Sequence, residues 1–241
     1  MSVLRVLAPA LRPPPGDRHG PLVPMLVTLT FLTGLVDAVS YLTLGHVFVA
    51  NMTGNVVFLG FALAGASGLS AIASLIALGA FLLGALAGGW LGARHAHRGK
   101  LLRAANVIQA ALILLALIVA LLVHEPLHEG VRYALIVILG LAMGVQNAAA
   151  QRLAVPELTT TVLTRTLTGI ASEASFLGGP GAKAGRRGLA VAMMLLGALA
   201  GGLLVLHVSV AATLALALAL SSGVGLAAHA VSRSDAVWTR A

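Results

Sequence analysis

Eight long apolar segments, separated by short polar stretches, constrain this chain more than any other feature of its sequence. A helix needs about 20 residues to span the hydrocarbon core of a bilayer, and most of the segments reach that length. The pattern predicts an all-α polytopic membrane protein in contact with a lipid bilayer. The segments are Leu22–Leu44, Val47–Ala66, Leu69–Ala93, Leu101–Val123, Val131–Ala150, Leu158–Leu177, Leu189–Val210 and Ala211–Val231.

The composition excludes a soluble fold. Hydrophobic residues make up 59% of the chain and charged residues only 9%, whereas soluble domains carry about 25% charged residues. The net charge of +8 lies in loops and tails between the apolar segments, which is the orienting bias of a membrane protein and not the continuous basic face of a nucleic-acid binder. We therefore expect no nucleic-acid partner.

The sequence contains no recognisable catalytic or metal-binding motif. The absence of cysteine excludes disulfides, thiolate catalysis and Cys-ligated metals. There is no His/Glu metal motif, no serine–base pattern and no glycine-rich phosphate loop. We expect no cofactor and no enzyme activity.

Two of the eight segments contain polar residues and glycine in their middle. Val47–Ala66 contains Asn-Met-Thr-Gly-Asn at positions 51–55, and Leu158–Leu177 contains six threonines with Arg165 and Glu173. Such interruptions are tolerated where a segment lines a cavity or packs on protein. We therefore predict six crossing helices plus two broken or re-entrant segments. Eight crossings are the alternative, because Asn, Thr and Gly also occur in ordinary crossing helices.

The positions of lysine and arginine favour six crossings. Eight crossings would put nine of these residues on the inner side and five on the outer side. Six crossings put thirteen inside and only Arg132 outside, with Arg165 in the membrane. Because cytoplasmic loops are rich in Lys and Arg, this topology makes residues 1–21 and 232–241 cytoplasmic tails that flank a single membrane domain, 22–231.

The chain also shows signs of internal duplication. The octapeptide at 82–89 recurs unchanged at 195–202, and the motif Gly34–Ala38 is echoed upstream of the second copy by Gly144–Ala148. This order predicts two repeats, about 22–123 and 131–231, and three crossings in each would give the repeats opposite orientations. Inverted repeats with a broken helix in each are a common plan for secondary transporters. Glycines of the octapeptides are expected at helix contacts.

Asp37 is the residue that most favours a functional site. An ionised carboxylate in hydrocarbon is costly, so it must be paired, protonated or exposed to a wet cavity. An inverted repeat would bring the first and sixth segments towards one interface, which makes Arg165 a candidate ion-pair partner. Without that partner, Asp37 would be a candidate proton carrier.

The remaining candidate contacts for a solute are amides and hydroxyls. Gly54 permits a break where main-chain groups open toward a ligand. A purely structural role, in which these side chains bond neighbouring helices, is an equal alternative. We expect the tracts 51–55 and 160–166 to approach each other near the centre of the bundle. The polar candidates are Asn51, Thr53, Asn55, Gln146, Asn147, Thr160, Thr161 and Thr164.

The strings Gly34–Tyr41 and Val47–Asn55 resemble the signature of the YoaK family of bacterial integral membrane proteins (domain of unknown function 1275). The run from Gly144 to Ala148, followed by Thr160–Thr164, resembles its second motif. The family pattern has glycine after the last threonine, where this chain has Arg165. The resemblance covers about residues 25–231 and implies a multi-pass protein of the bacterial inner membrane. It implies no activity or substrate.

Two functions remain open at this point. The leading hypothesis is a permease for an unidentified small solute, with a polar site where the two repeats meet. The alternative is a non-transporting scaffold or accessory subunit, in which oligomers are possible and the polar residues serve only helix packing.

Overall fold

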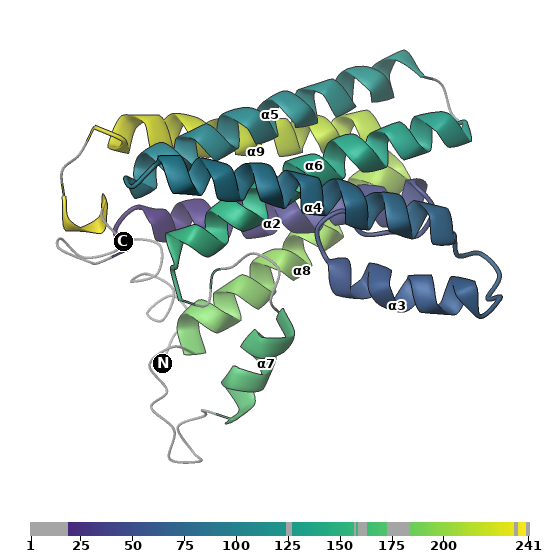
Figure 1. Cartoon of the computed structure of the whole chain (residues 1–241), viewed down its shortest axis with the longest axis horizontal. Helices are drawn as coiled ribbons and strands as arrows, with labels where there is room; N and C mark the ends of the chain where they lie inside the picture. The colour runs from purple at the N-terminus through teal and green to yellow at the C-terminus, as the bar shows by residue number, and fades with distance from the viewer. Residues whose placement is uncertain are drawn as a thin grey trace.

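The computed structural model describes residues 19–123, 127–156, 158, 163–172, 184–233 and 236–239. Every regular element within these ranges is a helix (Figure 1). In chain order they are α2 (Leu22–Thr43), α3 (Met52–Leu63), α4 (Ala71–Arg94), α5 (Arg98–Leu122), α6 (Glu129–Leu153), α7 (Leu163–Ser172), α8 (Ala184–His207), α9 (Val210–Val231) and the short 3-10 helix η2 (Val237–Thr239).

Six of these helices, namely α2, α4, α5, α6, α8 and α9, are long and apolar enough to cross a membrane. The shortest has 22 residues, and at 1.5 Å per residue it spans about 33 Å, which exceeds the ~30 Å hydrocarbon core. By contrast, α3 has 12 residues and α7 has 10, too few to cross alone. The prediction of an all-α polytopic protein with six crossing helices is confirmed.

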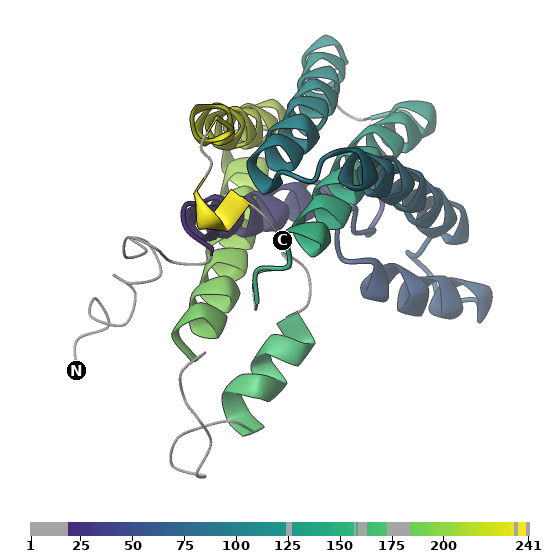
Figure 2. The ribbon, with the colours of Figure 1, turned by 60° about the vertical axis from the view of Figure 1, so that its left-hand side comes forward.

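The crossing helices are arranged as three pairs, α2 with α8, α4 with α6 and α5 with α9 (Figures 1 and 2). Each pair joins a helix from the first half of the chain to one from the second half. In the most apolar 18 residues of each helix, 83% are buried in α2 and 61% in α6, against 28–33% in the other four. The helices α2 and α6 therefore form the centre of the bundle.

Glycines bring α2 and α8 into main-chain contact. A Cβ atom on Gly34 would lie 2.5 Å from the carbonyl oxygen of Met194, and one on Gly197 would overlap the carbonyl of Phe31. In lipid, close packing of small residues replaces the hydrophobic drive between helices. The absent side chains thus set the distance between these two helices.

The contact between α4 and α6 has the same form. A Cβ atom on Gly84 would overlap the carbonyl of Leu141, and one on Gly144 would overlap that of Phe81. Gly84 and Gly144 hold the same places in their sequence motifs as Gly197 and Gly34. Gly89 differs, because nothing lies within 4 Å of a Cβ atom built there.

One end of the bundle is held by Arg98, the first residue of α5. Its side chain is buried and donates to the main-chain oxygens of Leu153 and of Trp238 (3.3 Å), and its Nη2 atom lies 3.4 Å from Nδ1 of His19. These contacts join the end of α6, the helix η2 and the segment before α2. The sequence analysis placed the start of this helix at Leu101. The structure starts it at Arg98, because the side chain of His97 caps the helix by accepting from the main-chain N–H groups of Gly99 and Lys100.

The glycine contacts predict a position-dependent effect of added methyl groups. Gly84→Ala should lower the stability of the protein by about 1–3 kcal/mol, because the overlapping atoms are main chain and cannot move aside cheaply. Gly89→Ala is the matched control in the same helix and should not be destabilising. Thermal melting of the detergent-solubilised protein measures both. A Gly84→Ala variant that melts with the wild type would contradict this contact.

Candidate functional site

After α2 the chain turns back along that helix through residues 44–51, before α3 begins at Met52. We call residues 44–51 the re-entrant turn. Gly45 has φ +102° and His46 has φ +57°, a left-handed reversal that glycine adopts without strain. The returning residues reach Asp37, which lies six residues, or about 9 Å, before the end of α2. The helix α3 therefore begins at a depth inside the span of α2, as expected for a re-entrant segment.

The Asp37 carboxylate fixes the start of α3. Its Oδ1 atom accepts hydrogen bonds from the main-chain N–H groups of Val49 (3.0 Å) and Ala50 (2.9 Å). Its Oδ2 atom accepts from the side-chain amide of Asn51, the residue that precedes α3. Asp37 itself is 5% exposed. The carboxylate thus satisfies main-chain donors that would otherwise be costly to bury in lipid.

Asn55 closes the same turn from the other side. Its Oδ1 atom accepts from the main-chain N–H of Phe48 (2.8 Å), and its Nδ2 atom donates to the carbonyl of Phe48 (2.5 Å). The Phe48 ring stacks on Tyr41, with ring centres 5.1 Å apart. A Cβ atom on Gly54 would lie 2.6 Å from that ring, so Gly54 is required by close approach. The neighbouring Thr53 is exposed.

The predicted ion pair between Asp37 and Arg165 is wrong. The hydrogen bonds to Asp37 come from residues 49–51 of its own re-entrant turn, and Arg165 is exposed on α7. The physical reason is that hydrogen bonds from the main-chain N–H groups of Val49 and Ala50 stabilise the ionised carboxylate. Asp37 obtains this stabilisation without a cation.

As far as the described residues 163–166 show, the second polar tract does not meet residues 51–55 in the centre of the bundle. Thr164 and Arg165 are exposed, and α7 packs on α8 while α3 packs on α4. Both views show α3 and α7 well apart (Figures 1 and 2). Because α2 and α6 run in opposite directions, the segments that follow them begin at opposite ends of the bundle. Thr160 and Thr161 lie outside the described residues.

Of the two candidates on α6, Gln146 reaches across to two other helices. Its Nε2 atom donates to the hydroxyl of Thr33 on α2 (2.9 Å), and its Oε1 atom accepts from Gln109 on α5 (2.5 Å). Asn147 is half-buried, and its amide donates back to the carbonyl of Met143 on its own helix (2.9 Å). Gln146 thus links the two central helices.

The bond network continues beyond Gln146 to residues that the sequence analysis missed. The hydroxyl of Ser221 on α9 lies 3.4 Å from the side-chain oxygens of both Gln109 and Asn106 on α5. Two amides within the apolar run Leu101–Val123, Asn106 and Gln109, were the signal that could have revealed them. We call the connected set the central polar chain, and each member is at most 2% exposed: Thr33, Asn106, Gln109, Gln146 and Ser221.

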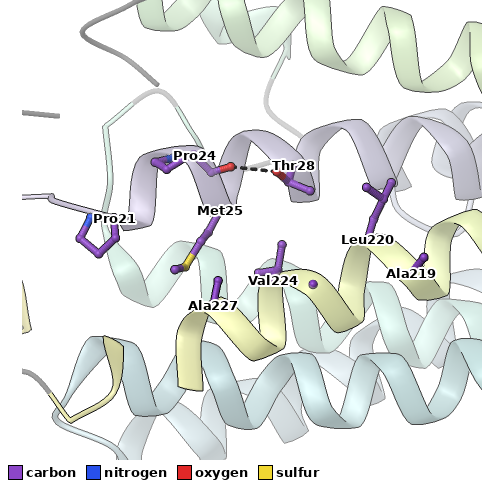
Figure 3. Close-up of a pocket in the computed structure, with 9 residues that line it drawn as sticks. Pro21, Pro24, Met25, Thr28, Ala219, Leu220, Val224 and Ala227 are labelled. Atoms are coloured by element: carbon purple, nitrogen blue, oxygen red, sulfur yellow. Dashed lines mark hydrogen bonds between the residues drawn. The ribbon is translucent and has the colours of Figure 1, made fainter. Parts of the chain in front are cut away.

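An apolar groove of about 350 Å³ runs between the first half of α2 and the second half of α9 (Figure 3). The hydroxyl of Thr28, the polar side chain in its lining, donates to the carbonyl of Pro24 (3.0 Å). The groove therefore presents hydrocarbon and offers little to a polar solute. The polar groups of Asp37, Asn51, Asn55 and the central polar chain are the better candidate site.

Comparison with known proteins identifies the family and supplies no activity. The family described as "Protein of unknown function (DUF1275)" matches residues 25–227. The chain is 31% identical over 154 residues to "UPF0700 transmembrane protein YoaK" of Bacillus subtilis (strain 168), a match that spans 63% of this chain and 66% of that protein. No solved structure matches the chain.

The bonds of Asp37 predict the effect of removing its charge. Asp37→Asn should destabilise the protein by about 1–3 kcal/mol, because buried main-chain donors lose part of their acceptor. Arg165→Gln alone should leave the melting temperature unchanged, and adding it to Asp37→Asn should give no rescue. The four proteins are compared by melting in detergent. Rescue in the double variant would show that the two charges do interact.

Proposed function

We propose that this chain, which belongs to the DUF1275 family, is a transporter that carries a small solute across the bacterial inner (plasma) membrane. The observation that carries the proposal is a helix that begins inside the bundle, with the residues just before it bound to the buried carboxylate of Asp37. Broken helices whose ends face a polar site are the usual binding elements of secondary transporters. A transport role also accounts for the polar residues that cross the bundle centre.

The pairing of the helices supports an inverted internal repeat. Exchange of the two halves replaces α2 by α6, α4 by α8 and α5 by α9. Under this exchange the α2–α8 contact becomes the α6–α4 contact, and the α5–α9 contact maps onto itself. The glycines follow the same rule, since Gly34 and Gly197 exchange with Gly144 and Gly84. We therefore propose that the transport site lies where the halves meet.

The hydrogen bonds of the re-entrant turn give the proposed mechanism a gate. Asp37 holds residues 49–51 by hydrogen bonds, and a solute with its own donors can compete for the carboxylate. Release of residues 49–51 would uncover the part of α2 around Asp37. This part lies one helical turn beyond Thr33, the member of the central polar chain on α2. A solute entering at α3 would then reach the interface between the halves.

A non-transporting scaffold or accessory subunit is the second candidate. It is favoured by the hydrogen bonds within the turn, where Asp37 binds residues 49–51 and Asn55 binds both main-chain groups of Phe48. Such bonds would also stabilise a purely structural re-entrant helix.

We propose that both termini are cytoplasmic, which labelling can test in this cysteine-free chain. Lys100, Arg233 and His128 are exposed and suit single replacement by cysteine. An impermeant thiol reagent applied to intact cells should label the cysteine at 128 and spare those at 100 and 233, which become reactive after the cells are opened. The reverse pattern would refute the proposed orientation.

Uptake by the purified protein in vesicles tests transport itself. Vesicles that contain the wild type should accumulate at least one member of a panel of labelled small solutes faster than protein-free vesicles. Asp37→Asn should lose most of that uptake, and Arg165→Gln, the control, should retain it. If no solute enters above background while the wild type remains folded, the scaffold is the better account.

A further inference from the structure

The central polar chain lies where the three helix pairs meet. Thr33 belongs to the α2–α8 pair, Gln146 to the α4–α6 pair, and Gln109 and Ser221 to the α5–α9 pair. Each bond from Gln146 therefore runs between two pairs. A change in the arrangement of the pairs must break or replace these bonds.

Three members of the central polar chain lie at the depth of a mid-membrane site. Thr33 is the twelfth residue of α2, Gln109 the twelfth of α5, and Ser221 the twelfth of α9. Each is thus near the middle of a helix that spans the bilayer. Transporters built from inverted repeats bind their substrates at this depth, at the interface of the repeats.

The hydrogen bonds within the central polar chain are incomplete. The hydroxyl of Ser221 has one hydrogen, yet it is the partner of two side-chain oxygens, those of Asn106 and Gln109, at 3.4 Å from each. The amide nitrogen of Gln109 directs one hydrogen to Gln146 and has the thioether of Met143, at 3.9 Å, for the other. A thioether is a weak acceptor. Buried groups satisfied this poorly are costly, and a ligand with its own donor and acceptor would complete them.

We propose that the central polar chain is a solute-binding site and that its ligand is a small uncharged molecule with both a hydrogen-bond donor and an acceptor, such as a simple amide. The members of the chain are amides and hydroxyls, which match such a ligand group for group. A charged solute would need a counter-charge at this depth, and the five members of the central polar chain are all uncharged. This inference rests on the proposed transport function, because the ligand reaches the central polar chain only when the helix pairs separate.

Alkylation of a single cysteine tests the site without knowledge of the natural solute. Ser221→Cys is made in the cysteine-free protein, reconstituted into phosphatidylcholine vesicles and treated with iodoacetamide, which is itself a small amide. Ser74→Cys is the matched control, since Ser74 on α4 is only 1% exposed and does not belong to the central polar chain. We expect alkylation at position 221 to be at least tenfold faster than at position 74.

Protection by unreactive probes defines the ligand class. Acetamide should slow alkylation at position 221, and sodium acetate at the same concentration should not. Adding Gln109→Leu should abolish the protection by acetamide, because acetamide loses its hydrogen-bond partner at position 109. Thr33→Cys gives a second position on the chain if Ser221→Cys melts below the wild type. Equal rates at positions 221 and 74, or equal protection by acetate, would overturn the proposal.

Acetamide flux, followed by the swelling of the same vesicles, separates the two proposals. Protected alkylation without flux would retain the site and reject transport. Flux through the wild type without alkylation at position 221 or position 33 would retain transport and reject this site.

Discussion

The main constraint on this molecule is that main-chain N–H and C=O groups inside a bilayer have no water to bond. The chain interrupts its helices at residues 44–51, at the depth of Asp37. Two side chains supply the missing partners there: the Asp37 carboxylate for the N–H groups of Val49 and Ala50, and the Asn55 amide for both groups of Phe48. These bonds decide where α3 begins, and α3 in turn leads the chain to the start of α4.

The second constraint is that apolar side chains gain little by leaving lipid for one another. Close approach of main chains replaces that gain, and it is possible only where a Cβ atom is missing. Gly34 and Gly197 join α2 to α8, and Gly84 and Gly144 join α4 to α6. Because each of these pairs takes one helix from each half of the chain, the two halves interlock.

The sequence was sufficient for the parts of the fold that depend on composition and length. Six crossing helices followed from apolar runs and from the positions of lysine and arginine. The partner of Asp37 could not be predicted in this way, because a search for partners in sequence finds charges such as Arg165 and does not find main-chain N–H groups. The central polar chain was missed for a related reason: Gln109 and Ser221 are single residues on helices far apart in sequence, and only the packing of α5 on α9 joins them.

Both polar features depend on α2, the most buried of the crossing helices. Thr33 and Asp37 are four positions apart, so they lie one turn apart on the same side of that helix. Thr33 bonds Gln146 across the centre of the bundle, and Asp37 bonds the residues just before α3. The contact with α8 at Gly34 lies between them in sequence and joins main chain to main chain. Since this contact is rigid and the bonds of Thr33 and Asp37 are exchangeable, motion that opens the bundle should move α2 and α8 together and break the two hydrogen-bonded contacts first.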